Sequence, residues 1–338
     1  MKAIKHFPCA AWNYSAEEIR DARLNHKLLN CDIELTRKCN LRCLFCYSAS
    51  GTGLNDELTL AQIRKIIDEA KELGVKTVTL TGGEPTIHPH FWEIVEHIRS
   101  KNLIVQIFTN GTMITPDVAT KFRVNGVFPC VSIESVRPEI HDKLVGVAGT
   151  YKKMLDGIVN LINVGYTKEI PLTINAVITK INYPYLEELW DWACTSAIEP
   201  FLLRLIPTGR SIENSGLEVS PKNVKKLIET MAIKKGYSPT VPYFGDGGCR
   251  KHYMSCYVNS QGFVQPCSGL NIKCGNVTQK SLSDIIRHSP IIKTMRNIDS
   301  ELVGKCSECN EKSKCYGCRA IAYAITGDLA ESDPLCWH

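Results

Sequence analysis

The sequence predicts an α/β fold in which six β/α repeats precede a small cysteine-rich segment. From residue 31 onward, short runs rich in β-branched residues alternate with longer segments whose apolar residues recur at helical spacing. After Arg210 this alternation stops, and nine cysteines follow between Cys249 and Cys336. Strands that alternate with helices form parallel sheets. The pattern leaves two alternatives, an open sheet and a barrel with missing units.

Each repeat contributes one strand and one helix to this prediction. The expected strands are residues 31–36, 76–81, 103–109, 127–135, 172–179 and 201–206, and the expected helices are residues 58–73, 89–101, 115–125, 150–165 and 183–198. A further helix is expected at 221–234, before a Gly- and Pro-bearing stretch at 236–246 that we take as a domain boundary. We therefore divide the chain into an N-terminal segment (1–27), a β/α domain (28–240) and a cysteine-rich domain (245–338).

Composition narrows the class of protein. The 338 residues are 44% hydrophobic, and the net charge of +5 is spread without basic runs, so no nucleic-acid partner is expected. The sequence shows neither a signal-peptide pattern nor an apolar run of membrane-spanning length, so we expect a cytoplasmic protein without a membrane partner. In that reducing compartment, 16 cysteines indicate metal binding rather than disulfides. Four scattered ones, Cys9, Cys31, Cys130 and Cys194, are interpreted as small buried hydrophobic residues.

Three cysteines lie in one loop directly after the first expected strand. Cys39, Cys43 and Cys46 form a CxxxCxxC pattern, one thiolate short of what a structural zinc ion or a fully protein-held [4Fe–4S] cluster needs. A cluster bound by these three would keep one iron open for another ligand. The alternatives are a zinc knuckle that recruits His88 or His90, and an electron-transfer cluster with a fourth cysteine.

Small polar groups follow or end the next expected strands. They are Gly82-Gly83-Glu84-Pro85 after the second strand, Asn110 after the third, Ser132 and Glu134 on the fourth, and Asn175 on the fifth. The carboxyl ends of parallel strands meet at one edge of the sheet, which is where α/β proteins bind ligands. The sequence therefore predicts one binding site at this edge, around the three-cysteine loop.

These residues resemble those of radical S-adenosylmethionine (SAM) enzymes. The shared motifs are the CxxxCxxC loop from Cys39 to Cys46 and the GGEP segment from Gly82 to Pro85, and the resemblance spans about residues 28–210. It implies a partial (β/α)6 TIM-like barrel and a [4Fe–4S] cluster whose open iron is chelated by SAM. It also implies reductive cleavage of SAM to methionine and a 5′-deoxyadenosyl radical, which removes a hydrogen atom from the substrate.

The same resemblance implies contacts between single residues and SAM. Phe45 and Tyr47 would lie near the adenine, and Gly82, Gly83 and Glu84 would hold the methionine amine. Ser132 and Asn175 would contact the carboxylate and ribose. The cofactor-binding set is completed by Pro85, Asn110 and Glu134. The sequence departs from the family at Val145, where many relatives place an arginine that grips the SAM carboxylate. Lys143 is the alternative candidate for that role.

The C-terminal cysteines suit two four-ligand sites with one cysteine left over, and a zinc site is the alternative for the group at 306–318. This segment resembles the SPASM extension of radical SAM enzymes, which binds one or two auxiliary [4Fe–4S] clusters. The resemblance implies at least one such cluster here and, at full ligation, two. The ligands of the second cluster would be Cys306, Cys309, Cys315 and Cys336. The first cluster would bind Cys267, Cys318 and two further cysteines from among Cys249, Cys256 and Cys274. Of these three we favour Cys249 and Cys256.

Three functions compete on this basis. The favoured one is a radical SAM oxidoreductase or maturase that modifies a peptide or protein side chain, with a partner protein supplying leader binding because only 27 residues precede the barrel. The second is the same chemistry on a tetrapyrrole carboxylate side chain. The run CRAIAYAITGD resembles enzymes of alternative haem pathways and also, in related form, peptide-modifying maturases for quinone cofactors, so it leaves both substrate classes open. The third is a multi-cluster electron carrier.

Reduced ferredoxin or flavodoxin is the expected electron donor, and the auxiliary clusters are expected to transfer electrons. No residue stands out as catalytic. Tyr243, Asp246 and Arg210 are candidates only because they lie between the two domains, where substrate would enter.

Overall fold

The computed structural model describes residues 10–167, 170–234, 236, 249 and 251–338. Nearly all of the predicted domain boundary at 236–246 lies outside the described residues, as do Cys9, Tyr243 and Asp246. Among the residues that are described, no helix combines the length and the apolar character needed to cross a bilayer.

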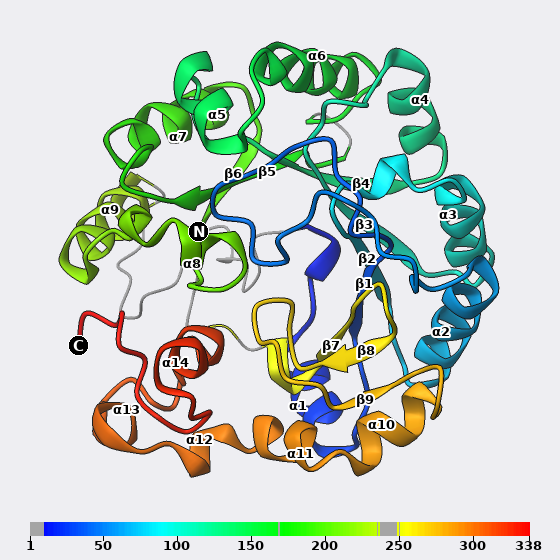
Figure 1. The fold of residues 1–338 in the computed structure, drawn as a ribbon, viewed down its shortest axis with the longest axis vertical. Coiled ribbons are helices and arrows are strands. Elements are labelled where there is room, and N and C mark those ends of the chain that lie inside the picture. Colours follow the sequence, from blue (N-terminus) through cyan, green and yellow to red (C-terminus); the bar gives the residue numbers. More distant parts are fainter. Residues whose placement is uncertain (1–9, 168–169, 235, 237–248, 250) are drawn as a thin grey trace.

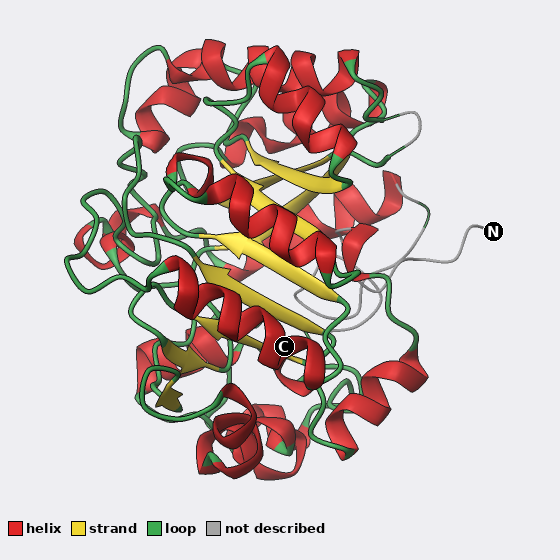
Figure 2. Ribbon diagram, turned by 90° about the vertical axis from the view of Figure 1, so that its right-hand side faces the viewer, coloured by secondary structure: helices red, strands yellow, loops and turns green. Residues whose placement is uncertain are grey.

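Six parallel strands form the centre of the molecule and confirm all six predicted strands with small shifts at their ends. They are β1 (Asn30–Glu34), β2 (Thr77–Thr81), β3 (Ile104–Thr109), β4 (Val127–Ser132), β5 (Thr173–Ile178) and β6 (Glu199–Arg204), and each pairs in parallel with the next. The sheet is curved but does not close, because β6 lies at one edge (Figures 1 and 2). This is the expected partial barrel.

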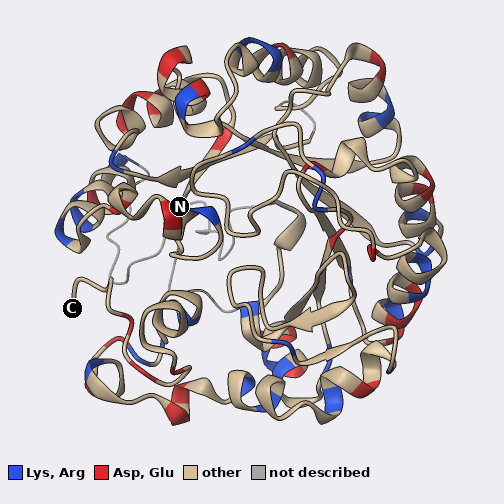
Figure 3. Cartoon of the chain, in the orientation of Figure 1, with Lys and Arg blue, Asp and Glu red and all other residues tan. Residues whose placement is uncertain are grey.

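Helices surround the outer face of this sheet (Figure 1). The helices that the sequence predicts are α2 (Leu60–Glu72), α3 (Phe91–Ser100), α4 (Pro116–Val124), α6 (Thr150–Asn163), α7 (Leu186–Thr195) and α9 (Pro221–Lys234). The structure contains in addition the helices α5 (Pro138–Val145) and α8 (Arg210–Glu213) and the short 3-10 turns η2 (Pro85–Ile87), η3 (Tyr183–Tyr185) and η4 (Ser215–Leu217). Local signals fix where they begin: Thr59 and Gln62 form a capping box at α2, and Thr115 caps α4. Figure 3 shows acidic and basic residues interspersed along these outer helices.

The two faces of the strands differ in polarity. Successive side chains of a strand point to opposite faces. Ile33 of β1 and Leu80 of β2 are fully buried in the main hydrophobic core, which lies between the sheet and its helices. Their neighbours Asp32 and Thr79 line a cavity inside the barrel instead. The barrel interior therefore carries polar strand residues among apolar ones such as Phe108 and Phe201 around an open cavity, which suits a ligand site rather than a packed core.

The N-terminal segment closes one end of the barrel. Its described part contains η1 (Ala10–Trp12) and α1 (Ala16–Leu24). The indole Nε1 of Trp12 donates to Thr79 Oγ1 at 3.2 Å, and the Ala11 carbonyl accepts from Thr77 Oγ1 at 2.8 Å. Trp12 also lines the cavity. The sequence predicts only a segment that precedes the barrel, whereas in the structure Trp12 of this segment forms the floor of the cavity.

The cysteine-rich segment continues the sheet of the barrel. Strand β7 (Ser255–Val258) pairs in parallel with β1, and β8 (Phe263–Gln265) and β9 (Gly275–Asn276) follow antiparallel. The remaining elements are η5 (Lys251–Tyr253), α10 (Leu282–His288), α11 (Pro290–Arg296), α12 (Ile298–Glu301), α13 (Gly304–Glu308) and α14 (Arg319–Thr326). In Figure 1, α10 to α13 extend the outer ring of helices, and α14 lies nearer the centre. The two parts therefore share one sheet.

Candidate active site

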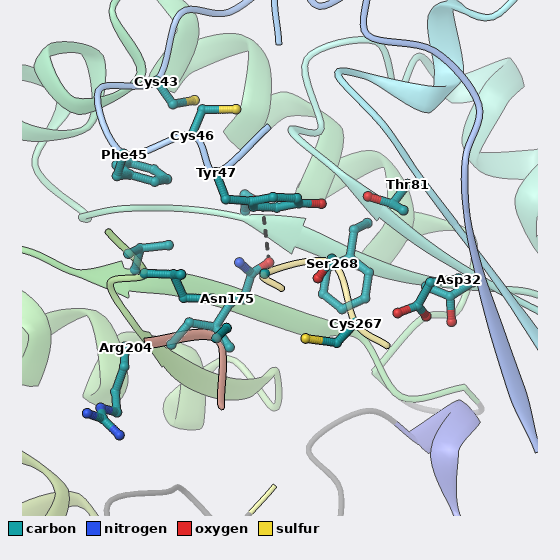
Figure 4. A pocket seen from close by; sticks show the side chains of 18 of the residues that line it. Asp32, Cys43, Phe45, Cys46, Tyr47, Thr81, Asn175, Arg204, Cys267 and Ser268 are labelled. Carbon is teal, nitrogen blue, oxygen red and sulfur yellow. Dashed lines mark hydrogen bonds between the residues drawn. The ribbon is translucent and has the colours of Figure 1, made fainter. Parts of the chain in front are cut away.

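One cavity of about 390 Å³ joins the two groups of cysteines. Its wall contains Cys39, Cys43 and Cys46 at the carboxyl ends of the strands, together with Cys249, Cys267 and Cys318 of the C-terminal segment. Figure 4 shows Cys43 and Cys46 beside Phe45 and Tyr47, with Cys267 and Arg204 across the cavity. Both rings expected near the adenine, Phe45 and Tyr47, thus face this space. His88 and His90, the alternative zinc ligands, do not line it.

Two thiols of the first loop, Cys39 and Cys43, are protonated at neutral pH in the metal-free chain, because their pKa values are raised. Burial raises the pKa of Cys39 to about 11 and that of Cys43 well above its usual value, and the neighbouring thiols of the loop contribute in the same direction. Iron binds thiolates, so loading this loop must displace protons. Three soft ligands from one loop fit three corners of a [4Fe–4S] cluster. Within the described ranges, no group of three or more Cys, His, Asp or Glu is placed to hold a single metal ion.

The segment after β6 holds the cysteine loop from one side. The Arg210 guanidinium donates from Nε to the Cys43 carbonyl at 2.8 Å and from Nη1 to the Ser50 carbonyl at 2.6 Å. Gly209 packs so closely that a Cβ there would lie 2.4 Å from the Cys46 carbonyl oxygen. Arg210 therefore positions the loop, a role that the sequence analysis missed. The sequence contained a signal for this role, because Gly209 and Arg210 follow the sixth strand in the same way as the other predicted polar groups follow or end earlier strands.

Helix α5 holds the loop from the other side. The Arg42 amide donates to the Val145 carbonyl and the Leu44 amide to the Leu144 carbonyl, both at 2.9 Å. A Cβ on Gly146 would lie 2.6 Å from the Arg42 carbonyl oxygen. Val145 thus supports the loop through its backbone and lines the cavity with its side chain. The structure does not bring Lys143 to the cavity, since its side chain is exposed.

The GGEP segment packs against the chain that leads into the cysteine loop. A Cβ on Gly83 would lie 2.1 Å from the Lys38 carbonyl oxygen, and one on Gly82 would lie 2.7 Å from the Thr36 carbonyl oxygen. The glycines are therefore required for contact with the protein itself, and both also line the cavity. Pro85 is buried at the start of η2.

Glu84 ties the ends of β2 and β3 together. Its buried carboxylate accepts from Thr109 Oγ1 at 2.8 Å, from the Asn110 amide at 2.7 Å and from the amide and hydroxyl of Thr86. The Glu84 side chain is not part of the cavity wall, whereas Asn110 is. Direct contact between Glu84 and the methionine amine stays a prediction.

The remaining predicted SAM contacts cluster at the ends of β4 and β5. Ser132 Oγ donates to Asn175 Oδ1 at 3.2 Å, the bond drawn in Figure 4. Glu134 accepts from the Val177 amide at 2.9 Å. Burial raises the pKa of Glu134 to about 8, with only that backbone bond opposing it. All three polar side chains face the cavity.

The C-terminal thiols separate into two neighbourhoods. Burial raises the pKa of Cys267 to about 12, and the Cys249 and Cys318 thiols lie close enough to raise it further. Cys315 has a pKa raised to about 12 by burial and has Cys336 and Cys306 as its thiol neighbours. Cys309 belongs to the same loop, after α13. These groupings fit the two ligand sets that the resemblance implies, except at Cys256.

The structure does not bring Cys256 to the cavity with the other cysteines predicted for the first auxiliary set. It lies on β7 directly opposite Cys31 of β1, is fully buried, and its sulfur is 3.8 Å from the Cys31 sulfur. Side chains alternate along a strand. Cys256 therefore points into the core with Ile33, away from the cavity, and Cys274 packs against the same core. Cys249, Cys267 and Cys318 converge on this part of the cavity wall, and Cys315 of the other neighbourhood also lines the cavity.

Buried basic side chains surround these three cysteines. Lys251 Nζ donates to Asp32 Oδ2 at 3.0 Å and lies 4.2 Å from the centre of the Trp12 ring. Arg204 makes a two-pronged ion pair with Asp333, at 2.7 and 3.0 Å. Both cations line the cavity. The sequence analysis singled out neither, although Lys251 lies two residues after a predicted ligand.

Comparisons with known proteins agree with this geometry. Residues 33–193 match the model of the radical SAM superfamily, and residues 249–310 match SPASM, described as an iron–sulfur cluster-binding domain. The chain is 32% identical to the "AdoMet-dependent heme synthase" of Methanosarcina barkeri, covering 90% of this chain and 94% of that one. It is 28% identical to the "Mycofactocin maturase MftC" of Mycolicibacterium smegmatis, covering 90% and 81%.

Solved structures share the fold. Streptococcus suis SuiB bound to SAM superposes with a TM-score of 0.72 at 20% identity, over 97% of this chain and 84% of that one. The enzyme anSMEcpe with bound AdoMet and a peptide gives a TM-score of 0.69 at 16% identity, over 89% and 92%. With its cysteine loop, its partial barrel and its cysteine-rich extension, the chain belongs to the radical SAM superfamily and is an enzyme of the class that carries a SPASM domain.

Proposed function

We propose that this protein is a radical SAM oxidoreductase that removes a hydrogen atom and then an electron from a carboxylate-bearing substrate. The observation that carries the proposal is the single cavity, because it places the three-cysteine loop and the first auxiliary thiols around one substrate space. When bound, SAM and its [4Fe–4S] cluster supply a 5′-deoxyadenosyl radical, and auxiliary [4Fe–4S] clusters supply an acceptor for the electron. The oxidised carbon completes a double bond by losing a proton or CO₂.

The residues of the cavity take distinct parts in this proposal. Cys39, Cys43 and Cys46 hold the first cluster, and Arg210 keeps their loop in place. The remaining SAM contacts are those proposed from the motifs: Phe45 and Tyr47 for the adenine, Gly82, Gly83 and Glu84 for the amine, and Ser132 and Asn175 for the carboxylate and ribose. Reduced ferredoxin or flavodoxin is the proposed reductant.

Lys251 is the proposed anchor for a carboxylate of the substrate. Its ammonium group has three N–H donors, and one is used by Asp32. The side chain is 20% exposed and faces the cavity, so further donors can reach a ligand there. Burial opposes its charge, but Asp32 outweighs this and holds the pKa of Lys251 above its usual value. A permanent cation at the cavity floor favours an anionic substrate.

A tetrapyrrole with carboxylate side chains becomes the preferred substrate class. Three relatives named as heme synthases match 90% of the chain at 27 to 32% identity. The sequence analysis favoured a peptide or protein side chain, and the 28% identity to a mycofactocin maturase supports that second candidate. The likeness to SuiB supports the fold alone. The electron-carrier hypothesis is set aside, because the chain belongs to an enzyme superfamily.

The experiment compares both substrate classes in one assay. The reconstituted protein is incubated without oxygen with dithionite, SAM and either an iron-containing tetrapyrrole with propionate side chains or a short carboxylate-bearing peptide. We expect 5′-deoxyadenosine in equal amount to an oxidised tetrapyrrole product. The Cys39/Cys43/Cys46 triple alanine variant should form neither.

Two substitutions test the carboxylate anchor. K251M together with D32N removes the buried pair as a unit, and K251R keeps the charge. We expect the double variant to raise the substrate KM at least about tenfold, the loss of roughly 1.4 kcal/mol of binding, while K251R retains most affinity. Product from the peptide alone would overturn the tetrapyrrole assignment, and absence of 5′-deoxyadenosine with both would overturn the proposed chemistry.

A further inference from the structure

Arg319 carries a buried guanidinium that forms no ion pair with a carboxylate of the described residues. The residue is 0% exposed, and its Nη1 donates to the carbonyl oxygens of Leu329 and Glu331 at 2.8 and 2.5 Å. Its Nε and Nη2 have no hydrogen-bond partner within the part of the chain that the structure describes. Buried charges and donors are normally paired, because leaving them unpaired is costly. The two free N–H groups therefore call for an acceptor that the polypeptide does not supply.

The guanidinium reaches the cavity wall beside the first auxiliary thiols. Arg319 follows Cys318 directly, and both residues line the cavity together with Gly317. A Cβ on Gly317 would lie 2.7 Å from Arg319 Nη2. The missing side chain of Gly317 thus leaves the space that the guanidinium end occupies, next to the backbone between Cys315 and Cys318.

The nearby carboxylates of the described residues already have partners. Asp333 accepts from Arg204 and from the Cys318 amide, and Asp32 accepts from Lys251. His252 is neutral at neutral pH, because burial and then the charges of Arg319 and Lys251 lower its pKa to about 3. A [4Fe–4S] core held by three thiolates is itself an anion with exposed sulfide acceptors. It therefore offers the negative charge and the hydrogen-bond acceptors that the Arg319 guanidinium otherwise lacks.

We propose that the free N–H groups of Arg319 donate to the auxiliary cluster held by Cys249, Cys267 and Cys318, and that its charge raises the reduction potential of that cluster. A nearby positive charge stabilises the extra electron of the reduced form, and hydrogen bonds to the sulfurs act in the same direction. Arg319 is thus a positioning residue that makes this cluster a better electron acceptor than it would be without the guanidinium. The inference rests on the cluster assignment in the proposed function.

A redox titration tests this without SAM or substrate. The full chain carries the Cys39/Cys43/Cys46 triple alanine changes, so only auxiliary clusters give a paramagnetic signal, and a further C267A variant identifies the signal of the first one. In this background R319Q should shift the midpoint potential of that signal downward and leave the other signal in place. R319K, which keeps the charge but loses the planar fork, should shift it in the same direction by less.

The matched control is R287Q, the same chemical change at an exposed residue of α10, and it should leave both potentials unchanged. Iron and sulfide counts accompany each variant. If R319Q fails to retain the cluster, the midpoint potential of the R319K variant is measured in its place. An unchanged potential in an iron-replete Arg319 variant overturns the proposal. If the potential is unchanged and R319Q in the otherwise wild-type chain raises the substrate KM, Arg319 is assigned to a substrate carboxylate instead. Loss of the proposed enzymatic activity would not alter this result, because the background cannot bind the SAM cluster.

Discussion

Two buried carboxylates, Glu84 after β2 and Glu134 after β4, show how hydrogen bonds change the pKa of a buried group. Burial raises the pKa of both Glu84 and Glu134. For Glu84, bonds from Thr86, Asn110 and Thr109 offset much of this effect. For Glu134, the Val177 amide is the opposing hydrogen bond, and the pKa rises to about 8. Glu134 is therefore a neutral carboxyl group at neutral pH, beside the loop that binds the first cluster.

The protonation of Glu134 predicts how stability depends on pH. The folded protein keeps this proton up to about pH 8, whereas an unfolded glutamate loses it near its ordinary pKa of about 4.3. Between these values the folded state binds more protons, so stability falls as pH rises. From about pH 6 to pH 9, the metal-free wild type should lose roughly 3 kcal/mol relative to E134Q, at about 1.4 kcal/mol per pKa unit. Urea unfolding at both pH values measures this.

The control for that measurement is E139Q, which makes the same change at an exposed position on α5. It should follow the wild type at both pH values. Parallel pH profiles for wild type and E134Q would show that Glu134 is ionised in the folded state.

The corrected position of Cys256 gives a second prediction at this scale. C256A removes a thiol that packs against Cys31 in the core, so we expect a loss of about 1 kcal/mol of stability and an unchanged iron content. C267A removes a thiol on the cavity wall and should lower the iron content by one cluster. Iron and sulfide analysis after anaerobic reconstitution decides between the two sites. Iron loss in C256A would restore it as a ligand.

At the scale of elements, two segments hold the three-cysteine loop between them. The segment after β6 contributes Arg210 and the close packing of Gly209, and α5 contributes two backbone carbonyls. Neither segment supplies a ligand. A loop whose carbonyls are fixed on both sides keeps its thiols oriented before iron arrives, which lowers the entropy lost on binding.

R210A tests this support. The Cys43 and Ser50 carbonyls lose their donor, so the loop should retain the first cluster poorly, with about four irons fewer per chain. Deoxyadenosine formation should fall at least about tenfold, or roughly 1.4 kcal/mol. R210K restores one donor and should recover part of both. Full iron content with full activity in R210A would contradict the role.

At the scale of the whole molecule, the cysteine-rich segment and the barrel are one structure. Strand β7 extends the barrel sheet at β1, and the Arg204–Asp333 pair joins the end of β6 to the C-terminal segment. Burial opposes the charge of Asp333, but the bonds from Arg204 outweigh it and hold the pKa of Asp333 below its usual value. The Cys318 amide donates to the same carboxylate at 2.9 Å. This pair therefore fixes Cys318, a proposed auxiliary ligand, relative to the barrel.

Breaking the pair should destabilise the protein strongly. R204A leaves a carboxylate with a 0% exposed side chain without its cation, which typically costs about 3–5 kcal/mol. The exposed pair Arg137–Glu188, 3.0 Å apart, is the matched control, and R137A should destabilise the protein far less, because solvent screens an exposed pair. Denaturant unfolding of both metal-free variants gives the comparison. Similar losses in the two would show that Asp333 is relieved by solvent after the change.

The sequence by itself determined the sheet, the cysteine loop and the class of enzyme. Strand periodicity, the CxxxCxxC spacing and the GGEP segment are local patterns, so neighbouring residues carry them in full. Only the tertiary structure decided that Cys256 leaves the ligand set, that Trp12 floors the cavity and that Arg319 faces it. Each depends on strand register or on contacts between residues far apart in the chain, such as Cys31 with Cys256 and Arg204 with Asp333. No local pattern encodes such pairings, because they arise only when the sheet has formed.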